Sequence, residues 1–149
     1  MGYKKINKED RLYFQTVVGE SNIFYSEEVL KEYSHDETED LSFLPEVVVK
    51  PQNTGQISDI MKYCNFQNIP VTPCGARTGL SGGSLPVESG LVLSLEKLNS
   101  IIEIDERNLQ STVEPGVINE VFQNEVKEKG LFYPPDPASK GSCMLGGNI

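Results

Sequence analysis

The spacing of apolar residues predicts a strand, a helix and a second strand between residues 47 and 74. Residues 47–49 are three consecutive valines between prolines, which is typical of a short buried strand. Residues 54–67 show helical spacing, with Thr54 available as the N-cap. The apolar face of this helix consists of Ile57, Ile60, Met61 and Cys64. Val71 begins another strand, which Pro73 interrupts, so the order predicts a βαβ unit in a parallel sheet.

Further elements are predicted downstream. Residues 91–95 read as a third strand, and residues 101–104 and 110–114 predict a hairpin around a turn at 105–108. The next helix is marked by Ile118, Val121, Phe122 and Val126. Gly130 can end this helix because glycine accepts a positive φ. Residues 131–149 are rich in Gly, Pro and Ser, which predicts a loop.

The first 44 residues form an acidic segment with two predicted surface helices, over about 8–18 and 26–33. The inward faces of these helices are expected to consist of Leu12, Val17, Val29, Leu30 and Tyr33. Their charged residues are interpreted as a solvated face. We therefore divide the chain into an N-terminal helical segment, 1–44, and a second region, 45–149.

Charge and composition exclude several classes of protein. The 149-residue chain has 13 basic and 22 acidic residues, a net charge of −9, which argues against nucleic acid and anionic membranes as partners. Its three cysteines show no CxxC spacing, so neither a disulfide framework nor a metal site is expected. The start shows no signal peptide, and no apolar run approaches the roughly 18 residues of a membrane span. Lone thiols fit a reducing compartment, so a cytoplasmic protein is expected.

The segment 73–84, PCGARTGLSGGS, carries four glycines directly after a predicted strand. Glycine permits close backbone approach, and successive main-chain N–H groups can form a nest for an anion. A phosphate bound here would rest on these N–H groups, on the hydroxyls of Thr78, Ser81 and Ser84, and on Arg77. The segment matches neither G-x-G-x-x-G nor G-x-x-x-x-G-K-[ST]. On glycine content alone, an ordinary surface loop between two strands is an equal alternative.

A second segment, YPPDPASKGSCMLGGN over 133–148, has prolines at one end and glycines at the other. Proline stiffens the backbone and glycine frees it, an arrangement that suits wrapping an extended ligand. Taken alone, this composition is typical of a loop.

Together these segments resemble the FAD-linked oxidases with a PCMH-type FAD-binding domain. The resemblance runs from about residue 33 to residue 149 and is carried, in order, by PCGARTGLSGGSLP, LVLSLEKLNSIIEID, VEPGV and GLFYPPDPASKGSCMLGGNI. Within the family it is strongest to the FAD-containing subunit of glycolate oxidase and to D-lactate and D-2-hydroxyglutarate dehydrogenases. It implies an α+β fold in which a small parallel βαβ lobe leads into an antiparallel lobe. It also implies that the chain is the N-terminal, truncated part of this domain.

The resemblance implies non-covalent FAD, with the diphosphate over the glycine loop. The implied contacts in that loop are Gly75, Ala76, Arg77, Thr78, Gly79, Ser81, Gly82 and Gly83. The other parts of FAD would be flanked by Pro115, Gly116, Pro135, Asp136, Ser139, Ser142, Gly146, Gly147 and Asn148. The implied reaction is hydride transfer from a small D-2-hydroxy acid, of the glycolate or D-lactate type, to the flavin. Iron–sulfur and other oxidase subunits are the implied partners.

The chain departs from the family pattern at two positions of the glycine loop. Cys74 stands where relatives often carry a basic residue, and Arg77 stands where many have a small one. Arg77→Ala is expected to weaken FAD retention, and unchanged retention would show that Arg77 is peripheral. Cys74 is expected to be a buried residue and not a nucleophile, since nothing basic is adjacent to it. His35 is expected to be structural or exposed, and Lys140 to be an ordinary solvated lysine.

No catalytic residue is expected in the chain itself. Relatives carry their substrate-binding histidine and arginine groups beyond the position of residue 149, and the chain has one histidine. The chain alone is therefore expected to be inactive and to bind FAD weakly. Two alternatives stay open: an FAD-linked oxidase of another substrate class, such as an aldonolactone or a cell-wall precursor, and a non-catalytic module that keeps the loop without flavin.

Overall fold

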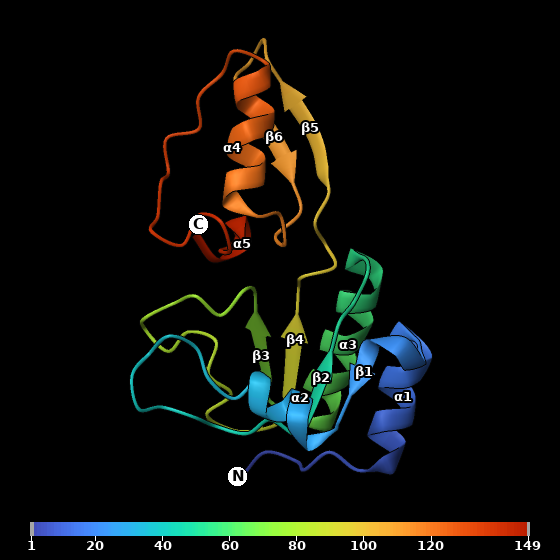
Figure 1. Ribbon diagram of the computed structural model, residues 1–149. Helices are drawn as coiled ribbons and strands as arrows, with labels where there is room; N and C mark the ends of the chain where they lie inside the picture. The colour runs from blue at the N-terminus through green and yellow to red at the C-terminus, as the bar shows by residue number, and fades with distance from the viewer. Residues whose placement is uncertain (1, 149) are drawn as a thin grey trace.

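The molecule consists of two lobes, one below the other in Figure 1, joined by the segment that follows strand β4. The computed structural model describes residues 2–148. The lower lobe contains a four-stranded sheet with parallel strands, and the upper lobe contains a two-stranded antiparallel sheet. The predicted α+β class, with a parallel lobe leading into an antiparallel one, is confirmed.

The sheet of the lower lobe has the order β1(Ile23–Phe24), β2(Val47–Val49), β4(Leu91–Ser94), β3(Val71–Cys74). Strands β2, β4 and β3 run parallel, with Val92 opposite both Val48 and Thr72, whereas β1 pairs antiparallel with β2 at the edge. The predicted strand–helix–strand unit exists, but β4 lies between its two strands. Strand β1 was not predicted because two residues are too few to show a period.

Helices cover both faces of this sheet. α1(Lys8–Val18) and α3(Thr54–Gln67) pack on one face, where Val47, Val49, Leu91 and Leu93 point. α2(Glu27–Glu32) packs on the other face, onto Val48 and Val92. A short 3₁₀ turn, η1(Glu20–Asn22), connects α1 to β1. Both faces of β2 and β4 are therefore buried, as expected for parallel strands in an α/β layer.

The prediction for the inward face of α1 was wrong at one position. Leu12 is 62% exposed, and the buried residues of α1 are Asp10, Phe14 and Val18. Asp10 is buried because it caps its own helix, accepting a hydrogen bond from Asn7 N, and pairs with Lys4. Its polar character concealed the true helix face in the sequence. The other predicted positions were confirmed: Leu30 and Tyr33 are buried, and Val17 and Val29 are packed against the core.

Helix α3 has the predicted bounds but a different cap. The side chain of Asn53 accepts a hydrogen bond from Gln56 N at 3.0 Å, so Asn53 is the N-cap and Thr54 is the first helical residue. Asparagine and threonine are both good caps, and the sequence offered them side by side. Ile60 and Cys64 face the core, whereas Met61 lies partly exposed at the margin of the apolar face.

The upper lobe contains β5(Ile101–Asp105), β6(Gln110–Val113), α4(Asn119–Glu128) and α5(Leu145–Asn148). The hairpin and α4 were predicted, whereas α5 was predicted as a loop. α4 ends as expected, with Gly130 at φ +71° and Leu131 N bonded to Val126 O at 2.9 Å. The core of this lobe is built from Val117, Phe122, Val126 and Leu145. None of the helices within residues 2–148 is long and apolar enough to cross a bilayer.

Candidate functional site

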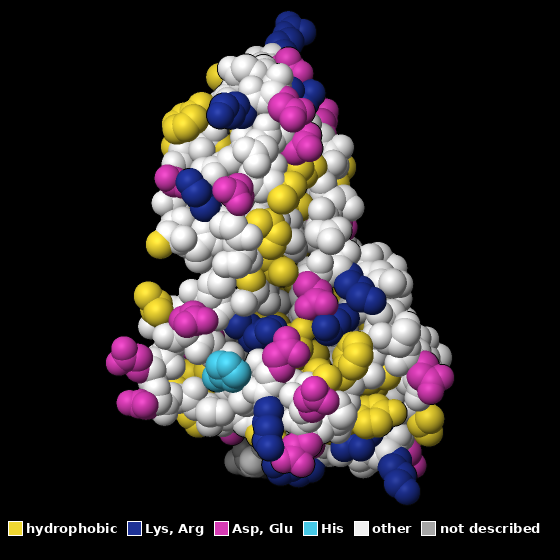
Figure 2. Space-filling view, viewed as in Figure 1, with side chains coloured by type: hydrophobic (Ala, Val, Ile, Leu, Met, Phe, Trp, Pro, Cys, Tyr) yellow, Lys and Arg dark blue, Asp and Glu magenta, His cyan; other side chains and the backbone are white. Residues whose placement is uncertain are grey.

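A cavity of about 450 Å³ lies where the glycine loop, residues 75–84, meets the last residues of the upper lobe. The space-filling outline narrows between the two lobes (Figure 2). The predicted residues that line the cavity are Gly75, Ala76, Arg77, Thr78, Gly79, Ser81, Gly83, Pro115, Ser139, Gly146, Gly147 and Asn148. The two segments that the sequence analysis singled out therefore face one space, although they lie in different lobes.

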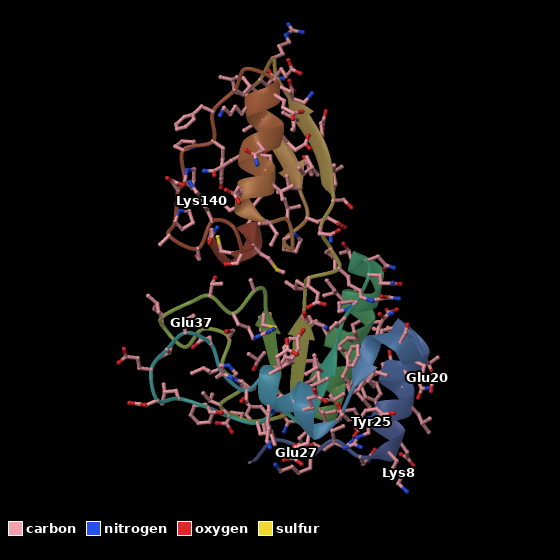
Figure 3. The ribbon with its side chains drawn as sticks, viewed as in Figure 1. Lys8, Glu20, Tyr25, Glu27, Glu37 and Lys140 are labelled. Atoms are coloured by element: carbon pink, nitrogen blue, oxygen red, sulfur yellow. The ribbon has the colours of Figure 1, made fainter. Side chains whose placement is uncertain are left out.

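Five predicted residues do not line the cavity: Gly82, Gly116, Pro135, Asp136 and Ser142. Gly116 has a packing reason of its own, since a Cβ there would lie 2.4 Å from Leu95 O. Asp136 pairs with Lys140, labelled in Figure 3 on the upper lobe, at 2.9 Å. Contact of these five residues with FAD stays a prediction.

The structure adds eight lining residues that were not among the predicted FAD contacts, although Ser84 was predicted to help hold a phosphate. They are Asp36, Pro73, Cys74, Leu80, Ser84, Leu95, Cys143 and Met144. All of them except Asp36 and Leu95 lie within the two segments, 73–84 and 133–148, that the sequence analysis singled out. Asp36 is different, because it comes from the N-terminal segment and no local pattern connects it with the glycine loop.

The glycine loop leaves a run of main-chain donors without partners. From Gly75 to Ser81, no main-chain N–H donates a hydrogen bond to an acceptor within residues 2–148. Unpaired main-chain amides in a half-buried loop are unfavourable unless water or a ligand accepts their hydrogen bonds. A Cβ at Gly79 or Gly83 would meet no atom within 4 Å, so the loop keeps open space beside these donors.

An anion in this cavity would be held by main-chain dipoles more than by net charge. Among the lining residues that the structure describes, only Asp36 and Arg77 carry a formal charge at neutral pH, and these are opposite in sign. Successive N–H groups can hold an anion without a surplus of cationic side chains. The residues present therefore fit a diphosphate group, even in a chain of net charge −9.

A short segment, residues 36–38, makes three hydrogen bonds with the glycine loop, and we call it the 36–38 strap. Glu37 N donates to Gly79 O at 3.1 Å, and Gly82 N donates to Thr38 Oγ1 at 2.8 Å. Ser84 Oγ donates to Asp36 Oδ2 at 3.3 Å. Figure 3 labels Glu37 on the lower lobe, across the waist from Lys140. Each bond anchors a different part of the loop to the strap.

The carboxyl group of Asp36 is almost fully buried yet stays ionised. Burial by itself would raise its pKa, but the hydrogen bonds from Thr38 and Ser84 together outweigh burial and lower the pKa below its ordinary value. Asp36 is therefore a charged acceptor that organises the strap and the end of the glycine loop.

Arg77 is the third residue of the loop, and its side chain is directed at α2. Its Nη2 atom lies 2.9 Å from Glu32 Oε1, and its guanidinium carbon lies 4.0 Å from the centre of the Tyr33 ring. The expectation that nothing basic lies beside Cys74 was wrong, because Arg77 is close enough to favour the Cys74 thiolate. Burial dominates, however, and raises the pKa of Cys74 to about 11. The expectation that Cys74 is buried is confirmed, and that it is not a nucleophile stays a prediction, which the raised pKa supports.

A polar network joins the carboxyl ends of β2 and β4. Lys50 Nζ pairs with Glu96 Oε1 at 2.8 Å, and the Tyr33 hydroxyl donates to Glu96 Oε2 at 2.9 Å. Burial opposes both charges, but the pair outweighs it, so the pKa of Lys50 is raised and the pKa of Glu96 is lowered. The carboxyl ends of parallel strands are where open α/β sheets bind ligands.

His35 and Lys140, the two side chains for which the sequence analysis considered alternative roles, do not line the cavity. His35 is exposed, with Nδ1 3.2 Å from Lys31 O. Lys140 is 44% exposed and engaged with Asp136. Residues 2–148 contain no cluster of three or more His, Cys, Asp or Glu side chains that could hold a metal ion.

Curated relatives match the chain over most of its length. Glycolate oxidase subunit GlcD of Bacillus subtilis (strain 168) is 47% identical over 117 residues, which are 78% of this chain and 25% of that protein. D-lactate dehydrogenase of Anaerostipes hadrus is 34% identical over 148 residues, covering 99% of this chain and 31% of the relative. A probable mitochondrial D-2-hydroxyglutarate dehydrogenase of Oryza sativa subsp. indica is 34% identical, covering 99% and 26% respectively. The chain thus spans between a quarter and a third of these relatives' length.

Solved structures share the fold at lower identity. An alkyldihydroxyacetonephosphate synthase aligns with a TM-score of 0.86 at 15% identity, covering 97% of this chain and 32% of that one. A p-cresol methylhydroxylase aligns with a TM-score of 0.73 at 24% identity, covering 87% and 27%. The family model described as FAD binding domain matches residues 45–149. The predicted family and its cofactor, FAD, are thereby confirmed, and the chain belongs to the FAD binding domain family.

Proposed function

We propose that this chain forms the diphosphate-binding part of the FAD site in an oxidoreductase that oxidises small D-2-hydroxy acids of the glycolate or D-lactate type. The observation that carries the proposal is the run of partnerless N–H groups from Gly75 to Ser81 on the wall of the cavity. The relatives named glycolate oxidase, D-lactate dehydrogenase and D-2-hydroxyglutarate dehydrogenase support the substrate class.

The residues of the chain would bind and orient the cofactor. The N–H groups of the glycine loop, with the hydroxyls of Thr78 and Ser81, would hold the diphosphate, and Ser139, Gly147 and Asn148 would border FAD from the upper lobe. Bound FAD supplies the hydride acceptor for oxidation of the hydroxy acid. Because no histidine lines the cavity among the described residues, we propose non-covalent binding of FAD and no catalytic residue within this chain.

The three cysteines are buried and free, which supports a reducing compartment, and we propose the cytoplasm. The relative GlcD is named as a subunit, which supports assembly with further oxidase subunits, an iron–sulfur protein among them.

The test is titration of the ¹⁵N-labelled chain with ADP and with FAD, followed by amide chemical shifts. This measurement detects millimolar affinity and so allows for weak binding. The expected result is movement of the resonances from Gly75 to Ser81 with both ligands and not with riboflavin, which lacks the diphosphate. Gly83→Ala, which places a methyl group in open cavity space, should weaken the response. Unmoved resonances at saturating ADP would contradict the proposal.

A further inference from the structure

The backbone at Arg77 has an unusual conformation for a residue with a side chain. Its φ is +59°, in the left-handed region that L-residues other than glycine seldom adopt. Such a conformation persists where surrounding contacts enforce it. Here the enforcing contacts are made by the guanidinium, which stacks on Tyr33 and pairs with Glu32, leaving the side chain only 19% exposed.

The group on which Arg77 stacks is itself fixed. Tyr33 is 1% exposed, and its hydroxyl donates to Glu96, whose other carboxylate oxygen accepts from Lys50. Arg77 is therefore connected through Tyr33 and Glu96 to the carboxyl ends of β4 and β2. Arg77 therefore combines side-chain contacts to Glu32 and Tyr33 with a main-chain N–H that has no acceptor within residues 2–148.

We propose that Arg77 is a positioning residue: by stacking on Tyr33 and pairing with Glu32 it holds residues 75–81 in the shape that presents their N–H groups to the diphosphate. This inference rests on the proposed function, and it assigns Arg77 to the loop's shape and not to direct ligation of the anion. The stack is the stronger contact, because it is packed on a buried ring, whereas the partner carboxylate of Glu32 is 60% exposed. A lysine cannot reproduce the planar stack.

The first test needs no ligand. Amide exchange at Glu37 and Gly82, whose N–H groups bond across the loop, reports how firmly the loop is held. Arg77→Gln is expected to accelerate exchange at both amides by roughly five- to tenfold, and Arg77→Lys by nearly as much. Glu32→Gln should give about a twofold change. The matched control is Arg107→Gln, which removes the same charge from an exposed hairpin turn and should change nothing. Unchanged exchange in Arg77→Gln would overturn the inference.

The second test separates positioning from direct binding. In the ADP titration, Arg77→Gln and Arg77→Lys should both raise the dissociation constant by about fivefold, and Glu32→Gln should raise it by about twofold. A direct ligand behaves differently: Arg77→Lys would keep most of the affinity, and Glu32→Gln would tighten binding by releasing the guanidinium. That pattern would overturn the inference. If the wild-type chain binds no ADP, the proposed function fails, while the exchange experiment still decides whether Arg77 holds the loop.

Discussion

Gly82 donates its main-chain N–H to the hydroxyl of Thr38 over 2.8 Å, and this bond joins the glycine loop to a segment 44 residues earlier in the chain. Gly82 has φ +70°, so the turn that aims this N–H at Thr38 is available to glycine without strain. The Gly82 amide therefore serves to hold the loop in place. The amides from Gly75 to Ser81 stay available for a ligand.

Thr38→Val should loosen the glycine loop. Valine keeps the shape of threonine but removes the acceptor for Gly82 N, and an unmet hydrogen bond of this kind costs about 1 kcal/mol. Urea unfolding should show a free energy of unfolding lower by about that amount. Thr38→Ser, which keeps the hydroxyl, is the control and should restore most of the loss. Equal stability of the valine variant and the wild type would show that the bond contributes nothing.

Asp36 should make stability depend on pH in the acid range. Its folded-state pKa lies below 3.8, the ordinary value for an aspartate, so its ionised form stabilises the fold above about pH 4. This contribution is lost as pH falls through the lowered pKa. Asp36→Asn should therefore lower stability near neutrality and show a weaker decline between about pH 5 and pH 2. Urea midpoints measured across that range would check it, with the exposed Asp40→Asn as control. Parallel curves for wild type and Asp36→Asn would contradict the assignment.

Gly116→Ala should destabilise the junction of the two lobes. The new Cβ would lie 2.4 Å from Leu95 O and 2.7 Å from Leu98 O, and backbone atoms on both sides leave little room to yield. Thermal or urea unfolding should show a loss of about 2–3 kcal/mol. Gly83→Ala has nothing within 4 Å of its Cβ and should leave stability within about 0.5 kcal/mol of wild type. A tolerated alanine at Gly116 would mean that the connection between the lobes adjusts more than the structure indicates.

Cys64 and Cys74 should resist alkylation in the folded chain. Burial raises the pKa of Cys64 to about 12 and that of Cys74 to about 11, so very little thiolate is present at pH 8. Iodoacetamide labelling followed by peptide mass spectrometry should find both unmodified in buffer and modified in urea. Rapid native labelling of Cys74 would show that the glycine loop opens frequently.

Much of the fold was predictable because its signals are local. The bounds of α1 and α3 and the position of β2 follow from apolar spacing within single elements. The errors came where polar residues replaced the expected pattern. Asp10 is buried in place of Leu12 because it caps its helix, and Asn53 takes the capping role expected of Thr54. β1 and α5 are too short for a period to be seen.

The candidate site was predictable only in part. Glycines and prolines mark their segments directly, so the two walls of the cavity were found in the sequence. The contribution of Asp36 was not, because it depends on a hydrogen bond to Ser84, 48 residues away. The same holds for Arg77, whose partner Glu32 lies 45 residues earlier. Contacts between residues so far apart in the chain produce no periodic pattern in the sequence.

By itself, the sequence determined the kinds of elements, their order and the glycine-rich backbone from which an anion site can be made, because periodicity and the conformational freedom of glycine act within a few residues. The tertiary structure alone decided that β4 enters between β2 and β3, that both loop segments face one cavity, and that the 36–38 strap and Arg77 both hold the loop. Those outcomes depend on how buried faces pack together, and that packing is a property of the whole chain.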